Sequence, residues 1–317
     1  MHARMPKHFV LEERLERYAD TIEVRPGAYA GRWAEACWPL GGADTATDGT
    51  AGGSAGSASG ADAPERARYQ RVYLDLGCGK GAWIVEAARR EPDALFIGVD
   101  GEPVCIAYAA QHILEAGVRN ALAVPGRAEQ LPALFAPGEL AGISLNFPTP
   151  APKRRDARTR LVNAGHLALL RPLLGSGAAI SFRTDNEPLF NYALPQFEAA
   201  GYQLLWTSCD DRAEHPDQPC TEYEARMVAE GARVLALRAV ASGPAPTPER
   251  LQAARELPQS LYDYLPEDLF AGGYTPHGMG YGVANLRNAR LRREAASLGT
   301  AMGASAPRQA GEISAFA

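Results

Sequence analysis

The sequence predicts an α/β fold with a doubly wound, mainly parallel sheet of about seven strands and helices on both faces. From Arg71 onward, short β-rich runs alternate with stretches of helical pattern. Parallel strands need crossover connections, which helices on both faces of the sheet provide. The first strand also runs directly into a turn that contains three glycines and then into a helix. Ligands of such folds bind at the carboxyl ends of the strands.

The expected elements follow one another along the chain in this alternating order. Strands are expected over residues 71–76, 95–99, 121–124, 142–146, 178–183, 202–207 and 233–238. Helices are expected over residues 80–90, 103–116, 158–174, 186–200 and 219–230.

The composition is typical of a globular protein, and we expect it in the cytoplasm. Of the 317 residues, 46% are apolar, and we find no apolar run of the roughly 18 residues that a membrane span needs. The five cysteines form no CxxC pair, which argues against a zinc site or a disulfide framework. A net charge of −5 argues against nucleic acid coating the whole surface but allows a local basic patch. The oligomeric state stays open, with a monomer favoured.

Four segments divide the chain. Residues 1–40 are expected to pack on the core through Trp33 and Trp38. Residues 41–66, composed almost only of small and polar residues, are expected to be a flexible linker. Residues 67–240 form the α/β domain, and residues 241–317 form a partly helical extension with about the last 20 residues disordered. The extension carries Tyr274, Tyr281 and a basic stretch, which could contact RNA or simply form a surface helix.

The glycine-rich turn reads Asp75-Leu76-Gly77-Cys78-Gly79-Lys80-Gly81. A dinucleotide-binding turn of the form GxGxxG would need a glycine at residue 82, where this chain has alanine. The turn instead resembles that of Rossmann-like S-adenosylmethionine-dependent methyltransferases. The resemblance implies that Asp75, Gly77 and Gly79 bind the cofactor. Asp100, at the end of the next strand, is placed to accept hydrogen bonds from ribose hydroxyls.

Three later motifs resemble those of the bacterial tRNA (guanine-N7)-methyltransferases. They are the run from Asn146 to Arg160 (NFPTPAPKRRDARTR), the Thr184-Asp185 pair after the next strand, and Thr221-Glu222-Tyr223-Glu224. They occur in the order of the family's motifs, and the resemblance covers roughly residues 70–240. It implies tRNA as the partner and contacts to the cofactor from four further residues: Arg127, Ala128, Asn146 and Thr149.

Methylation of guanine N7 sets limited chemical demands. The nitrogen carries a lone pair and no proton, so the reaction needs no general base, only alignment and exclusion of water. The guanine N1–H and N2–H₂ groups need acceptors, and Asp185 and Glu224 are the candidate catalytic carboxylates, with Thr221 adding a hydroxyl. By resemblance Lys153 contacts the substrate. With Arg154, Arg155, Arg158 and Arg160 it forms a basic cluster suited to RNA phosphates.

Each of these residues also has a structural explanation. The basic cluster could be a solvated face. Asp185 could cap the following helix, and Thr221 with Glu224 could form a capping box. The chain could also be a non-catalytic protein that binds tRNA or cofactor, or a methyltransferase with another acceptor.

The chain departs from the family pattern at four positions and carries Arg127 where such enzymes often have an acidic or amide side chain. Thr149 and Ala151 stand where the family has Asp and Trp, Asp156 where it has His, and Thr159 where it has Arg. By resemblance these positions line the guanine and RNA side of the pocket, so the substrate side is partly rewritten.

Overall fold

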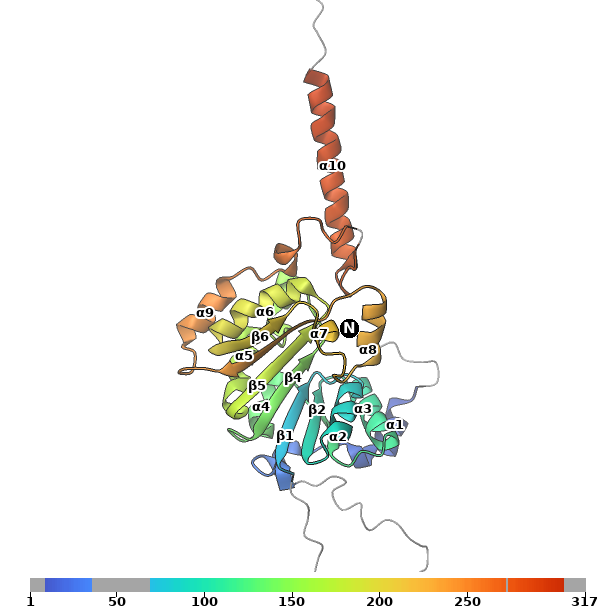
Figure 1. Ribbon diagram of the computed structural model, residues 1–317, viewed down its shortest axis with the longest axis vertical. Coiled ribbons are helices and arrows are strands. Elements are labelled where there is room, and N and C mark those ends of the chain that lie inside the picture. Colours follow the sequence, from blue (N-terminus) through green and yellow to red (C-terminus); the bar gives the residue numbers. More distant parts are fainter. Residues whose placement is uncertain (1–8, 36–68, 272, 305–317) are drawn as a thin grey trace, which may run out of the picture.

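A seven-stranded sheet with the order β3-β2-β1-β4-β5-β7-β6 lies at the centre of the protein (Figure 1). The structure is a computed structural model that describes residues 9–35, 69–271 and 273–304, so the expected linker and Trp38 lie outside it. The first five strands pair in parallel, and β7 runs antiparallel to both β5 and β6. The strands are β1 Arg71–Leu76, β2 Ala94–Asp100, β3 Ala121–Pro125, β4 Leu140–Asn146, β5 Leu174–Thr184, β6 Tyr202–Ser208 and β7 Leu235–Ala241. The predicted doubly wound, mainly parallel sheet is therefore confirmed.

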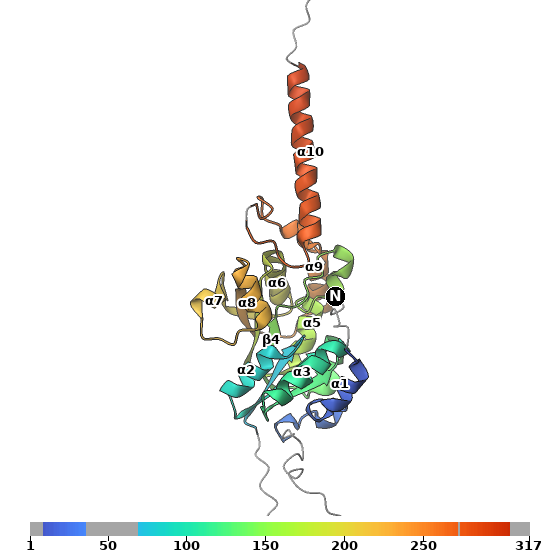
Figure 2. The same ribbon diagram turned by 90° about the vertical axis from the view of Figure 1, so that its right-hand side faces the viewer.

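Helices cover both faces of the sheet (Figures 1 and 2). On one face α2 and α3 pack against β2 and β3, and α1 packs against α3. On the other face α6 packs against α5 and α9. The helices are α1 Leu11–Arg17, α2 Ala82–Arg90, α3 Pro103–Glu115, α4 Leu131–Leu134, α5 Ala164–Leu170, α6 Glu187–Ala199, α7 Asp211–Glu214, α8 Glu222–Ala229, α9 Pro248–Glu256 and α10 Gly280–Ala304.

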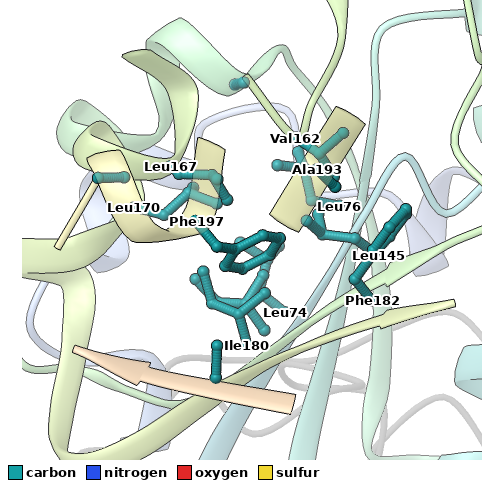
Figure 3. Close-up of a cluster of buried hydrophobic side chains, with 14 of the residues drawn as sticks. Leu74, Leu76, Leu145, Val162, Leu167, Leu170, Ile180, Phe182, Ala193 and Phe197 are labelled. Atoms are coloured by element: carbon teal, nitrogen blue, oxygen red, sulfur yellow. The ribbon is translucent and has the colours of Figure 1, made fainter. Parts of the chain in front are cut away.

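Two hydrophobic cores follow from this layering. Side chains of β1, β4 and β5 meet those of α5 and α6 on one face, where Leu74, Phe182 and Phe197 are fully buried (Figure 3). On the other face Ile84 of α2 and Ile113 of α3 pack on the sheet. Because β2 is covered on both faces, its first six residues are all buried, which explains its continuous apolar sequence.

The expected helix over residues 158–174 is wrong. The structure has a 3-10 helix at Arg154–Thr159, then α5, then a second 3-10 helix at Arg171–Leu173 that leads directly into β5. Asn163 sets the start of α5, because its side chain accepts a hydrogen bond from the His166 N–H at 3.0 Å.

The terminal segments are attached in different ways. Trp33 is fully buried, and its indole N–H donates to the Leu134 carbonyl at 2.8 Å. At the other end, α10 projects from the body of the protein in both views (Figures 1 and 2). It continues to Ala304, so part of the end that we expected to be disordered is helical, and residues 305–317 lie outside the described structure.

Candidate active site

The strand order reverses between β1 and β4, and the glycine-rich turn lies at the carboxyl end of β1. Ligand sites of doubly wound folds form at such a reversal. Gly81 has a φ of 75°, and a Cβ there would lie 2.8 Å from the Cβ of Ala109. Only glycine allows both this backbone conformation and this close approach of the turn to α3. At Gly79 no atom lies within 4 Å of the corresponding position, so this part of the turn is open.

Asp75 lies beneath this turn and is 1% exposed. The side-chain amide of Asn146, at the end of β4, donates to its carboxylate at 3.1 Å. Burial raises the pKa of Asp75 to about 7, because the low-dielectric surroundings disfavour the charged form. A buried carboxylate of this kind is stabilised by a cation placed beside it.

Asp100 lies at the end of the neighbouring strand β2, beside the same turn. Its carboxylate accepts hydrogen bonds from the backbone N–H groups of Gly79 at 2.9 Å and Glu102 at 2.8 Å. Burial raises its pKa, and these backbone hydrogen bonds oppose the rise. The side chain of Arg127 lies against Gly101, where an added Cβ would be 3.2 Å from the Arg127 Cγ. Sequence-predicted residues of the cofactor side thus meet around the ends of β2 and β3.

A cavity of about 810 Å³ joins the glycine-rich turn to the later motifs. Of the sequence-predicted residues, Asp75, Gly77, Gly79, Asn146 and Thr221 line it. Its other walls include Trp83 of α2, Phe147 after β4, and Tyr223 and Arg226 of α8. A volume of this size accommodates a ligand of cofactor dimensions.

Asp185 follows β5 and is 8% exposed. One carboxylate oxygen accepts a hydrogen bond from the Tyr223 hydroxyl at 3.3 Å, and the other accepts one from the Tyr274 hydroxyl at 2.5 Å. It does not cap α6, because the side chain of Asn186 accepts the capping hydrogen bond from Leu189 N–H. Tyr223 connects Asp185 to the cavity, since the tyrosine lines it.

Glu224 occupies a buried ion-pair network instead of the cavity wall. It is fully buried, and its carboxylate accepts two hydrogen bonds from Arg183, at 2.8 and 3.0 Å, and one from Arg212 at 2.7 Å. Arg183 also donates to Asp211 at 2.7 Å. Thr221 caps α8 as the structural alternative predicted, accepting from the Glu224 N–H at 3.1 Å. The Glu224 carboxylate binds the two arginines. It does not form the reciprocal hydrogen bond with the Thr221 backbone N–H that would complete a capping box.

The predicted basic cluster divides into two parts. Lys153, Arg154, Arg155 and Arg158 are exposed, and Thr149 is exposed just before them. Arg160 is different: it is 1% exposed and donates to the backbone carbonyls of Pro150 and Ala151. The expectation that Arg160 faces RNA phosphates is therefore wrong. Its guanidinium holds the loop after β4 and lies 4.4 Å from the centre of the Tyr192 ring.

Aromatic residues of the site, namely Trp83, Phe147 and Tyr223, were not selected from the sequence. Phe147 and Tyr223 both line the cavity, and their ring centres lie 5.4 Å apart. Phe147 has a φ of 48°, an uncommon backbone conformation for a bulky residue. Both residues lie within the motifs, but a motif does not show which side chains face the cavity.

Within the described residues, no helix is long and apolar enough to cross a membrane, and no group of three or more His, Cys, Asp or Glu side chains could hold a metal ion.

Comparison with known proteins defines the class of this site. Residues 69–237, which include the glycine-rich turn and all three later motifs, match the family described as "Putative methyltransferase". The protein is thus a methyltransferase with a Rossmann-like fold.

The tRNA (guanine-N(7)-)-methyltransferase of Geobacillus kaustophilus is 34% identical over 172 residues, which are 54% of this chain and 79% of the relative. That of Geobacillus thermodenitrificans is 34% identical over 164 residues, 51% of this chain and 76% of the relative. The chain belongs to the tRNA (guanine-N7)-methyltransferase family.

Among solved structures, the 16S rRNA methyltransferase KamB superposes with a TM-score of 0.45 and 20% identity, covering 55% of this chain and 89% of that chain.

Proposed function

We propose that this chain transfers a methyl group from S-adenosylmethionine to N7 of a guanine in tRNA, in the cytoplasm. The observation that carries the proposal is a cavity that joins the glycine-rich turn and Asp75 to Phe147, Thr221 and Tyr223. One end of it has the features of a cofactor site and the other has the motifs of an acceptor site.

The residues around the turn fit S-adenosylmethionine. Asp75 is a buried carboxylate whose raised pKa reflects the cost of its desolvation, and the ammonium of the methionine moiety would offset that cost. Gly77 and Gly79 leave the backbone accessible, and Asp100 offers a carboxylate for ribose hydroxyls. Arg127, the buried Ala128 and Asn146 complete this side, and Thr149 stays a predicted contact. When bound, the cofactor supplies an electrophilic methyl group on a sulfonium centre.

The acceptor side needs alignment rather than proton transfer. Guanine N7 attacks with its own lone pair, so the chain contributes orientation and a water-poor site. Asp185 is the carboxylate that we assign to the guanine donors, beside the aromatic surface of Phe147 and Tyr223. We assign Glu224 a positioning role, because it is held by Arg183 and Arg212. Lys153, Arg154 and Arg155 are exposed and would bind RNA phosphates.

A transfer assay on unmodified tRNA, followed by nucleoside analysis, tests the proposal. We expect a labelled methyl group to appear as 7-methylguanosine. Asp185→Ala should abolish transfer while cofactor binding, measured by calorimetry, persists. Asp93→Ala is the matched control, because Asp93 is exposed just before β2, far along the strand from its carboxyl end. Full transfer by Asp185→Ala would contradict the role assigned to this carboxylate.

The four departures in the loop after β4 favour one alternative, a different acceptor. Asp156 places a negative charge in the basic run and pairs with Arg155 at 3.6 Å. In that case the label would appear on another nucleoside or a small molecule, and transfer would not need Arg154 and Arg155.

A further inference from the structure

The C-terminal strap, which we define as residues 257–271 and 273–279, crosses the acceptor side of the site. It lies outside the segment that matches the methyltransferase family, residues 69–237. Its first anchor is Leu261, which is fully buried and whose N–H donates to the Pro152 carbonyl at 2.9 Å. Its last anchor includes Gly278, where an added Cβ would lie 3.6 Å from the Pro150 ring. The Leu261 hydrogen bond ties the strap to the loop that follows β4, and Gly278 lies beside the same loop.

Between these anchors the strap reaches the acceptor residues themselves. The Tyr274 hydroxyl donates to Asp185 at 2.5 Å and lies 3.1 Å from the sulfur of Met227 in α8. The His277 ring packs edge-on against Tyr223, with ring centres 6.5 Å apart. One segment therefore contacts the loop after β4, the carboxylate after β5 and helix α8.

The two carboxylate oxygens of Asp185 are held unequally. The strap's Tyr274 binds one oxygen at 2.5 Å, whereas Tyr223 binds the other at 3.3 Å. A hydrogen bond to a charged acceptor is strong and directional when it is short. Burial, with the nearby carboxylate, raises the pKa of Tyr274, so its hydroxyl keeps its proton and remains a donor. Each oxygen still has a lone pair that can accept a hydrogen bond from a base.

We propose that Tyr274 is a positioning residue that fixes the Asp185 carboxylate in the orientation that receives the acceptor guanine. The inference rests on the proposed function, since it assigns an orienting partner to that function's guanine-binding carboxylate. It also assigns the C-terminal strap a role in the acceptor site of this chain.

Tyr274→Phe in the full-length protein removes only the hydroxyl. We expect kcat for methyl transfer to fall about ten- to hundredfold, because a carboxylate held only by the longer Tyr223 hydrogen bond aligns N7 poorly. KM for tRNA should change less than about twofold, since phosphate contacts dominate RNA affinity.

Tyr264→Phe is the matched control. Tyr264 lies in the same strap, and its hydroxyl donates only to the Pro258 carbonyl among the hydrogen bonds described for it. This control should keep wild-type kcat.

A binding measurement separates this inference from the proposed function. Guanosine 5′-monophosphate and inosine 5′-monophosphate, which lacks the N2 amine, are titrated by NMR into each protein with S-adenosylhomocysteine present. Wild type and Tyr264→Phe should prefer the guanine nucleotide, and Tyr274→Phe should lose about tenfold of that preference.

The outcomes are distinguishable. If wild type transfers no methyl group to tRNA but Tyr274→Phe alone loses guanine preference, the proposed function fails and the positioning role stands. If Tyr274→Phe matches Tyr264→Phe in both kcat and nucleotide preference, the positioning role is overturned. A faster Tyr274→Phe enzyme would also overturn it, because the tyrosine would then obstruct the acceptor.

Discussion

Burial of the Asp75 carboxylate lowers the stability of the cofactor-free protein, and the same buried charge favours binding of a cation. It is 1% exposed, and burial raises its pKa from the ordinary 3.8 to about 7. A carboxyl group with a raised pKa in the folded state holds a proton that the unfolded chain has already released between these two pH values. The folded state is therefore favoured most at pH values below the ordinary pKa, and this advantage is lost as the pH rises to about 7.

Asp75→Asn should remove this pH dependence. One pKa unit corresponds to about 1.4 kcal/mol, so the advantage of the variant over wild type should grow with pH toward an upper limit of about 4 kcal/mol above pH 7. Urea unfolding of both proteins without cofactor, from pH 5 to pH 8, measures the difference. A stability difference that stays constant over this range would contradict the raised pKa.

Cofactor affinity should show the opposite trend with pH. If the ammonium of the cofactor binds the ionised form of Asp75, binding must release the proton held by this carboxyl at lower pH. We expect the affinity for S-adenosylhomocysteine to fall nearly tenfold per pH unit below pH 7 and to level off above it. Calorimetry at pH 6 in two buffers of different ionisation enthalpy would detect the released proton. Asp75→Asn should show weak binding with no proton release.

At the scale of elements, β5 and α8 are joined by buried charges. Arg183 near the end of β5 binds both Glu224 of α8 and Asp211 of α7, and Arg212 binds Glu224 from the other side. This arrangement fixes α8 against the sheet and so places Thr221 and Tyr223 at the cavity wall. The buried network therefore supports the wall of the cavity that α8 forms.

Glu224→Gln should cost about 3–5 kcal/mol of unfolding free energy, because it leaves the buried Arg183 without its full counter-charge. Chemical denaturation measures this loss. Glu222→Gln is the control, since Glu222 is exposed in the same first turn of α8, and it should change stability by less than about 0.5 kcal/mol. A Glu224→Gln protein that is as stable as wild type but inactive would instead restore Glu224 to direct contact with the base.

Local sequence patterns predicted the layered part of the fold well. The strand over residues 71–76 has the bounds of β1, because its apolar run ends at glycines that force a turn. The local patterns failed for residues 158–174, where one long helix was predicted. The capping side chain of Asn163 and the burial of Arg160 divide this segment. Which of the predicted site residues meet depends on the direction in which their side chains point. Asp75 and Asp100 meet at the turn because neighbouring parallel strands end together, whereas the partners of Glu224 come from two distant segments that no local pattern identifies.

At the scale of the whole molecule, the distribution of charge matters more than its sum. The net charge is −5, yet Lys153, Arg154, Arg155 and Arg158 are all exposed within the loop after β4. The buried Arg160 holds the same loop through hydrogen bonds to its backbone, and the C-terminal strap binds it through the Leu261 hydrogen bond to Pro152. A basic loop held in this way beside the cavity would fix the position of an RNA backbone relative to the acceptor site. The net negative charge of the chain would disfavour RNA bound in other places.

The salt dependence of tRNA binding tests this division of charge. Each phosphate contact adds about 0.7–0.9 to the slope of log K against log salt concentration. Arg154→Ala combined with Arg155→Ala should therefore lower the slope by about 1.5 and weaken binding most at low salt.

Arg17→Ala combined with Arg25→Ala removes the same charge from exposed positions in the N-terminal segment. Because distant surface charges are screened within about 10 Å at 0.1 M salt, this control should leave the slope almost unchanged. Equal slopes for the two double variants would mean that RNA senses only the total charge of the protein, and the loop after β4 would lose its role in placing the substrate.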